Sequence, residues 1–136
     1  MTGVRPNSSA LRIFLVEDHR DSLDLLWIYL EHSGYVVLFA RSKAEALRGI
    51  PNANCDVLLS NIDLPDGNGW DLIREAGKSC PAYAILMSGF GTEADCERSA
   101  EAGFRHHLVK PVSVAELTVL LDKAVAELRG QQKLSA

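Results

Sequence analysis

The chain has 136 residues, a hydrophobic fraction of 47%, a charged fraction of 24% and a formal net charge of −4. These values indicate one globular domain with a substantial core, and they exclude a generally basic, nucleic-acid-binding surface. The longest uninterrupted apolar run in the first predicted helix, residues 25–30, is too short to cross a bilayer, and residues 1–10 lack the apolar core of a signal peptide. We therefore expect a cytoplasmic protein that contacts neither nucleic acid nor membrane directly.

Short apolar runs alternate with helical patterns along almost the whole chain. We predict a polar, flexible tail at residues 1–10, one domain at 11–129, and a second tail at 130–136. In chain order the predicted elements are a strand at 11–16, a helix at 21–33, a strand at 35–40, a helix at 44–50, a strand at 55–60, a helix at 69–76, a strand at 82–87, a helix at 93–102, a strand at 104–109 and a helix at 114–128.

Capping signals support the helix starts. Ser42, Thr92 and Ser113 are each followed three residues later by an acidic residue, which predicts an N-cap and, for Ser42 and Ser113, a full capping box. Pro51, followed by Asn52, is expected to break the second helix.

The first predicted helix has an unusually wide apolar face. Four residues fall at helical spacing toward one side: Leu23, Leu26, Trp27 and Leu30. Three more widen that face, and we expect deeper burial to explain them better than a dimer contact: Leu25, Ile28 and Tyr29.

The three cysteines are scattered and form no CxxC pair, which favours reduced, structural residues over a disulfide or metal site. They are Cys55, Cys80 and Cys96.

The alternation of strands and helices predicts an α/β fold, (βα)5: a doubly wound five-stranded parallel sheet in the flavodoxin-like order 2-1-3-4-5. Ligands of such sheets bind outside the carboxyl ends of the strands. Polar residues gather at those ends in this sequence: Glu17, Asp18, Asn61, Ser88 and Lys110.

Together these residues suit phosphoryl chemistry, although no single one of them indicates it. Two adjacent acids with further oxygen ligands nearby suit Mg²⁺. A hydroxyl at Ser88 and an ammonium at Lys110 could hold phosphoryl oxygens. Each residue taken singly is equally compatible with a solvated loop or surface position.

Four segments, in order and at matching spacing, resemble the receiver domain of two-component response regulators: LVED (15–18), SNIDLPDGNGWDL (60–72), LMSGFG (86–91) and HLVKPV (107–112). The resemblance covers residues 11–129. Receiver domains catalyse their own phosphoryl transfer and dephosphorylation but are signalling switches rather than enzymes in the usual sense.

The resemblance also assigns roles to individual residues. It implies that Asp18 binds Mg²⁺, that Glu17 acts through water, and that the backbone carbonyl of Asp63 completes the metal site. Ser88 and Lys110 would contact the phosphoryl group. The phosphoacceptor position of the family, an aspartate, falls on Asn61.

That asparagine is the main departure from the family pattern. An amide is neutral and a poor nucleophile, so we predict no phosphorylation at Asn61, weaker metal binding, and a metal-free fold more stable than that of an Asn61→Asp variant. Two origins fit: an engineered or isolated change in an otherwise complete pocket, or a natural receiver that works without phosphate.

His107 is a second departure. The family often places an aromatic residue three positions before the lysine, where it works with the hydroxyl at Ser88 as a switch. An imidazole there could make the switch pH-sensitive, or it could be an ordinary half-buried strand histidine.

The implied partner is a histidine kinase or histidine phosphotransfer domain that docks near the first helix. Output would leave by the fourth helix, fifth strand and fifth helix. HLVKPV and SNIDLPDGNG resemble receivers fused to sensor kinases, which points to a hybrid histidine kinase. With no DNA-binding domain expected after residue 128, we expect direct transcriptional action to need another chain.

Two other functions are open. One is a phosphorylation-independent docking module with a natural Asn61. The other, a flavodoxin-like cofactor protein or small hydrolase, is disfavoured because acids stand where a phosphate-binding loop would follow the first strand.

Overall fold

The computed structural model describes residues 10–89 and 91–135, and of residues 131–135 the backbone alone. The tail predicted at 1–10 lies, except for Ala10, outside the described residues. One parallel sheet contains five strands: β1 (Arg12–Val16), β2 (Val36–Ala40), β3 (Val57–Asn61), β6 (Tyr83–Ser88) and β7 (His106–Val109). Their order across the sheet is β2-β1-β3-β6-β7, which confirms the predicted doubly wound α/β fold.

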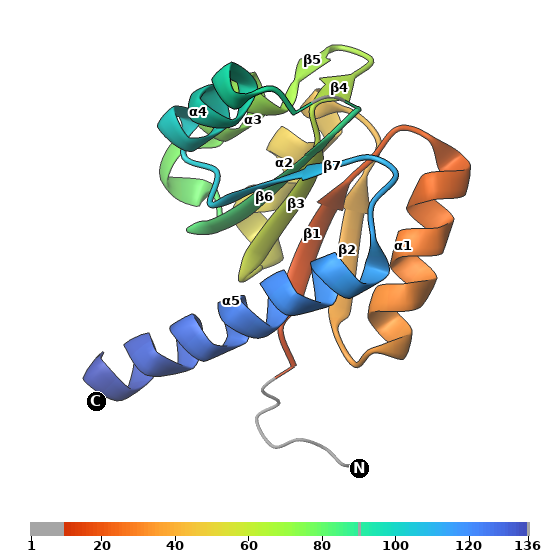
Figure 1. The fold of residues 1–136 in the computed structure, drawn as a ribbon. Coiled ribbons are helices and arrows are strands. Elements are labelled where there is room, and N and C mark those ends of the chain that lie inside the picture. The colour runs from red at the N-terminus through yellow and green to blue at the C-terminus, as the bar shows by residue number, and fades with distance from the viewer. Residues whose placement is uncertain (1–9, 90, 136) are drawn as a thin grey trace.

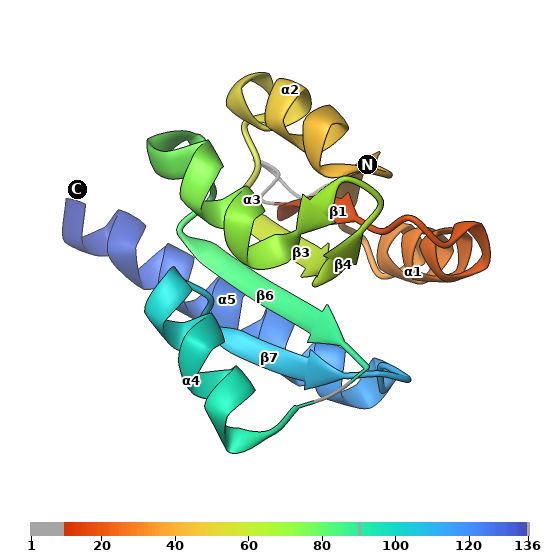
Figure 2. The ribbon, with the colours of Figure 1, turned by 90° about the horizontal axis from the view of Figure 1, so that it is seen from above.

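Helices cover both faces of this sheet (Figures 1 and 2). One face carries α1 (Arg20–His32) and α5 (Val114–Ser135), and the other carries α2 (Lys43–Ala53), α3 (Gly69–Ala76) and α4 (Glu93–Ala102). Because successive strand residues point to opposite faces, the apolar runs supply two cores at once. In β1, Ile13 packs in the core beneath α1 and α5, whereas Phe14 packs in the core beneath α2 and α3.

Helix α4 contributes least to these cores. Ser99 is its one buried residue, which agrees with the polar, alanine-rich sequence. Its predicted cap is present: the Thr92 hydroxyl accepts from the Asp95 backbone N–H, and the Asp95 carboxylate accepts from the Thr92 backbone.

The caps at Ser42 and Ser113 also form, through the backbone N–H groups of Glu45 and Glu116. The full capping box predicted at Ser42 is wrong, however. The Glu45 carboxylate accepts from the backbone N–H of Arg41, one residue earlier.

Two predicted helix ends are wrong. Helix α2 continues through Pro51 to Ala53 and ends at Asn54, whose φ of 55° is left-handed. So close to the helix end, the missing proline N–H removes only one late hydrogen bond. Helix α5 runs to Ser135 instead of ending at 128, because Gly130 alone costs only about 1 kcal/mol relative to alanine and good helix formers follow it.

Three short elements were not predicted from the sequence. Strands β4 (Asp63–Leu64) and β5 (Gly67–Asn68) form a small antiparallel hairpin, and the 3-10 turn η2 (Gly77–Ser79) follows α3. Two-residue strands are too short to show a periodic pattern.

The expected deep burial of the wide α1 face is wrong for two residues. Leu25 is 71% exposed and Ile28 is 65% exposed, whereas Tyr29 is half-buried. Leu25 and Ile28 lie on the outer side of α1, because Leu23 and Leu30 already supply the contact with the sheet.

Candidate functional site

The residues predicted to form the site lie at one edge of the sheet. Glu17 and Asp18 directly follow β1, Asn61 is the last residue of β3, Ser88 is the last residue of β6, and Lys110 directly follows β7. The register of the sheet brings these ends together, because Val16 pairs with Ser60, Asn61 with Met87, and Ser88 with Val109.

Asn61 is 6% exposed, and its side-chain amide bridges two neighbours. The amide nitrogen Nδ2 donates to the Oδ1 atom of Asp18 at 3.3 Å and to the backbone carbonyl of Asp63 at 2.8 Å. The Asp63 side chain itself is exposed, so this residue contributes to the site through its backbone.

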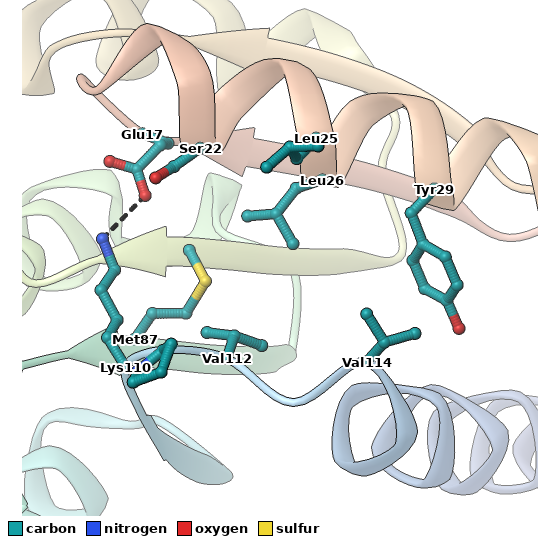
Figure 3. Close-up of a pocket in the computed structure, with 10 residues that line it drawn as sticks. Glu17, Ser22, Leu25, Leu26, Tyr29, Met87, Lys110, Val112 and Val114 are labelled. Carbon is teal, nitrogen blue, oxygen red and sulfur yellow. Dashed lines mark hydrogen bonds and ion pairs between the residues drawn. The ribbon is translucent and has the colours of Figure 1, made fainter.

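Glu17 and Lys110 form a separate ion pair. The Lys110 ammonium lies 2.9 Å from Oε1 of Glu17, whose side chain is fully buried, while Oε2 accepts from the backbone N–H of His19 at 3.1 Å. A buried carboxylate requires such partners, and Glu17 has one for each oxygen. Figure 3 shows the pair with Lys110.

Ser88 and His107 begin a third group of contacts. The Ser88 hydroxyl lies 2.6 Å from Nε2 of His107, and the Ser99 hydroxyl lies 3.1 Å from Nδ1 of the same ring. Ser99 also accepts from the Trp70 indole N–H at 3.0 Å. A chain of polar contacts therefore leads from the sheet edge to α3 and α4.

Ser99 and Trp70 were not predicted as part of this arrangement. A single serine in a polar helix carries no pattern that reveals burial. Its role depends on how α3 and α4 pack against β7, which no local spacing encodes.

A groove of about 390 Å³ opens beside the ion pair, between α1 and the segment that leads into α5. Its lining is mostly apolar, with Glu17 and Lys110 at one end (Figure 3): Ser22, Leu25, Leu26, Tyr29, Met87, Pro111, Val112 and Val114. The Tyr29 hydroxyl is hydrogen-bonded to that of Thr118, which ties α1 to α5 at the other end.

Comparison with known proteins identifies the family. Residues 13–122 match the response regulator receiver domain, so the chain belongs to that family, and it is a signalling domain rather than a classical enzyme. The solved receiver domain (CheY-like) from Methanospirillum hungatei JF-1 has 30% sequence identity and a TM-score of 0.83, over 90% of this chain and 99% of that one.

Curated relatives are similar at the same level. The transcriptional regulatory protein CusR of Escherichia coli is 31% identical over 79% of this chain and 48% of its own length. The virulence sensor protein BvgS of Bordetella pertussis is 31% identical over 86% of this chain and 10% of its own length. An uncharacterized 14.6 kDa protein of Leptolyngbya boryana is 32% identical over 82% of this chain and 87% of its own. The chain thus spans about half of the first and a small part of the second.

Receiver domains generally bind Mg²⁺ at their acidic pocket, but the residues of this chain do not fit the ion as they stand. An N–H donor of Asn61 points at the two oxygens that would be ligands, those of Asp18 and Asp63. The Glu17 carboxylate is already paired with the Lys110 ammonium. Among the described residues, no group of three or more His, Cys, Asp or Glu side chains could hold a metal. None of the described helices is long and apolar enough to cross a membrane.

Proposed function

We propose that this chain is the receiver of a two-component phosphorelay in which Asn61 prevents aspartyl phosphorylation. The observation that carries this proposal is the position of Asn61, the last residue of β3, between Asp18 and Asp63. A carboxylate there could attack phosphorus. An amide nitrogen that donates hydrogen bonds cannot.

The remaining roles follow from the family. Ser88 and Lys110 would contact a phosphoryl group at this edge, Asp18, Glu17 and the Asp63 carbonyl would form the Mg²⁺ site in a form with aspartate at position 61, and Ser88 with His107 would form the switch. Residues 11–129 would fold as the receiver, in the cytoplasm.

The proposed partner is a histidine kinase or a histidine phosphotransfer domain that presents a phosphohistidine. We place its docking surface at α1 and the adjacent loops, where Leu25 lines the apolar groove and both Leu25 and Ile28 are exposed. Output would leave through the face formed by α4, β7 and α5. The similarity to the sensor BvgS supports a hybrid kinase as the parent protein.

A second function, a phosphorylation-independent docking module, is favoured by the charge balance of the pocket. Lys110 is paired with Glu17, and the Asn61 amide is paired with Asp18, so these groups are satisfied without a phosphoryl group. Partner affinity that depends strongly on Mg²⁺ would argue against this function.

The test is intact-mass measurement after incubation with acetyl phosphate and Mg²⁺, on the chain and on Asn61→Asp. In the variant, an oxygen of the introduced carboxylate would bond to phosphorus as the bond from phosphorus to acetate breaks and acetate leaves. We expect one phosphoryl mass on the variant and none on the chain as written. If neither form gains it, the docking module becomes the better function, and phosphorylation of the chain as written would mean that the acceptor is another residue.

A further inference from the structure

The side-chain amide of Asn61 lies where the family resemblance places a cation. Its nitrogen Nδ2 donates to Asp18 at 3.3 Å and to the carbonyl of Asp63 at 2.8 Å, and both oxygens belong to the implied metal site. The two N–H groups of this amide nitrogen, one for each acceptor oxygen, supply the positive charge density that these oxygens need. We infer that the Asn61 amide is an internal substitute for the cation, so that this receiver is closed to divalent metal from within.

The amide is held in this place by its surroundings. Asn61 is buried at the end of the central strand β3, in register with Met87 of β6. On its other side the backbone of Gly69 packs so closely that a Cβ there would lie 3.0 Å from the Asn61 carbonyl oxygen. These contacts fix the backbone of Asn61, and the two hydrogen bonds from Nδ2 orient its side chain.

The buried carboxylate of Glu17 does not need a metal ion, because both of its oxygens already have partners. Glu17 has Lys110 at one carboxylate oxygen and the His19 backbone N–H at the other. A cation that approached Asp18 would have to displace the Asn61 N–H, and the amide would have to turn its oxygen Oδ1 inward. Both hydrogen bonds from Nδ2 would be lost in that rotation.

This inference differs from the simpler view that asparagine only lacks a charge. If the amide were a neutral but usable ligand, replacing it with alanine would remove an oxygen and weaken cation binding. If the amide occupies the cation position, alanine empties that position and binding strengthens. The two views therefore predict opposite effects of Asn61→Ala.

The experiment measures Mn²⁺ binding, from the electron paramagnetic resonance signal of the free ion, to the chain, Asn61→Ala, Asn61→Asp and Asp122→Asn. We expect Asn61→Ala to bind about threefold to tenfold more tightly than the chain, because the ion no longer displaces two hydrogen bonds. Asn61→Asp should bind at least about a hundredfold more tightly, since it adds a unit charge near the ion. Asp122→Asn is the matched control, because it also removes one exposed carboxylate but lies on α5, outside the residues of the pocket, and it should bind like the chain.

Binding by Asn61→Ala that equals or falls below that of the chain would overturn the inference. A second measurement needs no variant: in ¹⁵N-labelled chain, the Asn61 side-chain amide signal should keep its position and slow proton exchange in millimolar Mg²⁺. A shift or faster exchange of that signal in Mg²⁺ would overturn the inference as well.

The inference rests on the proposed function only in its choice of the pocket, and the two can fail separately. If Asn61→Asp is phosphorylated but Asn61→Ala gains no affinity for Mn²⁺, the receiver function stands and the cation substitute is wrong. If Asn61→Asp is not phosphorylated but Asn61→Ala gains affinity, the reverse holds.

Discussion

Asn61 shows how one atom can affect the stability of the whole fold. In metal-free buffer its amide donates two hydrogen bonds, whereas an aspartate would face the Asp18 carboxylate and the Asp63 carbonyl with acceptors only. We expect Asn61→Asp to lower the free energy of unfolding by about 1–3 kcal/mol, the usual cost of hydrogen bonds lost to charged or buried groups. Urea denaturation in a chelator measures this.

The control is the same comparison in saturating Mg²⁺, where the ion screens the added charge and the deficit of the variant should shrink. An Asn61→Asp variant that resists urea better than the chain in the chelator would contradict the argument.

Ser99 joins two neighbouring groups through one hydroxyl. It is 1% exposed, accepts from the Trp70 indole and contacts His107 Nδ1. Ser99→Ala should lower the free energy of unfolding by about 1–2 kcal/mol, because the indole N–H loses its partner in a buried site. Urea denaturation checks this, with the exposed Ser79→Ala as control. Equal stabilities of the two variants would mean that the contact contributes nothing.

The contacts of His107 bear on the pH sensitivity considered from the sequence. Both ring nitrogens face hydroxyl groups, those of Ser88 and Ser99. A hydroxyl can accept or donate, so these contacts do not fix which ring nitrogen carries a hydrogen. The pH dependence of partner affinity therefore stays a prediction.

His106 is the histidine for which we do predict a pH effect on stability. Burial lowers its pKa, helped by Lys123 and Arg105. Below the ordinary value of about 6.5 the unfolded chain therefore binds more protons than the folded one, so stability falls as the pH falls from there toward the lowered pKa. Thermal unfolding between mildly alkaline and mildly acidic pH measures this slope.

His106→Gln should flatten the slope. The matched control is His32→Gln, an exposed histidine at the end of α1, and an equal change of slope in both variants would show that His106 is not its source.

At the scale of elements, α2 depends on a cap that comes from another part of the chain. The Asp66 carboxylate, in the turn between β4 and β5, accepts from the backbone N–H groups of Lys43 at 2.7 Å and Ala44 at 2.9 Å. These two hydrogen bonds lower the pKa of the Asp66 carboxyl, and the one from Ala44 has the larger effect. The small hairpin thereby fixes the start of α2 near the site.

Asp66→Ala should lower the melting temperature by a few degrees, because two N–H groups of the first helical turn lose their partner. The pH dependence of this stabilisation follows from the lowered pKa of Asp66. The cap stabilises fully above the pKa of about 3.9 that an aspartate has in the unfolded chain, and its effect is lost as the pH falls through the folded pKa. Differential scanning calorimetry at two pH values tests both. Asp63→Ala, an exposed acid of the same hairpin, is the control, and an equal loss in that variant would contradict the cap.

The elements also show what sequence reasoning can reach. Helices α3 and α4 have the predicted bounds, because local caps mark their ends: Asn68 and Gly77 for α3, and Thr92 and Gly103 for α4. The extension of α2 past Pro51 and the hairpin of β4 and β5 depend on tertiary contacts instead. At the site, the strand ends that carry Asn61 and Lys110 were predictable, but their hydrogen-bond partners were not, since a side chain's choice of partner depends on geometry between elements.

At the scale of the whole molecule, the two helices on one face of the sheet leave an exposed apolar surface. Leu25 and Ile28 are exposed on α1, and Leu25 lines the groove that ends at Lys110 (Figure 3). Apolar residues this exposed contribute little to folding, so a charge at either position should change stability by less than about 0.5 kcal/mol. Their effect should therefore fall on partner binding.

Leu25→Asp and Ile28→Asp should each weaken binding to a histidine phosphotransfer or kinase dimerisation domain by about tenfold, because a charge would enter the apolar centre of the interface. Surface plasmon resonance against such domains from the same genome measures this. Val119→Asp is the matched control, since Val119 is a similarly exposed aliphatic residue on α5. Equal losses in all three variants would show that charge alone is responsible, and unchanged binding in the α1 variants would place the partner on another face.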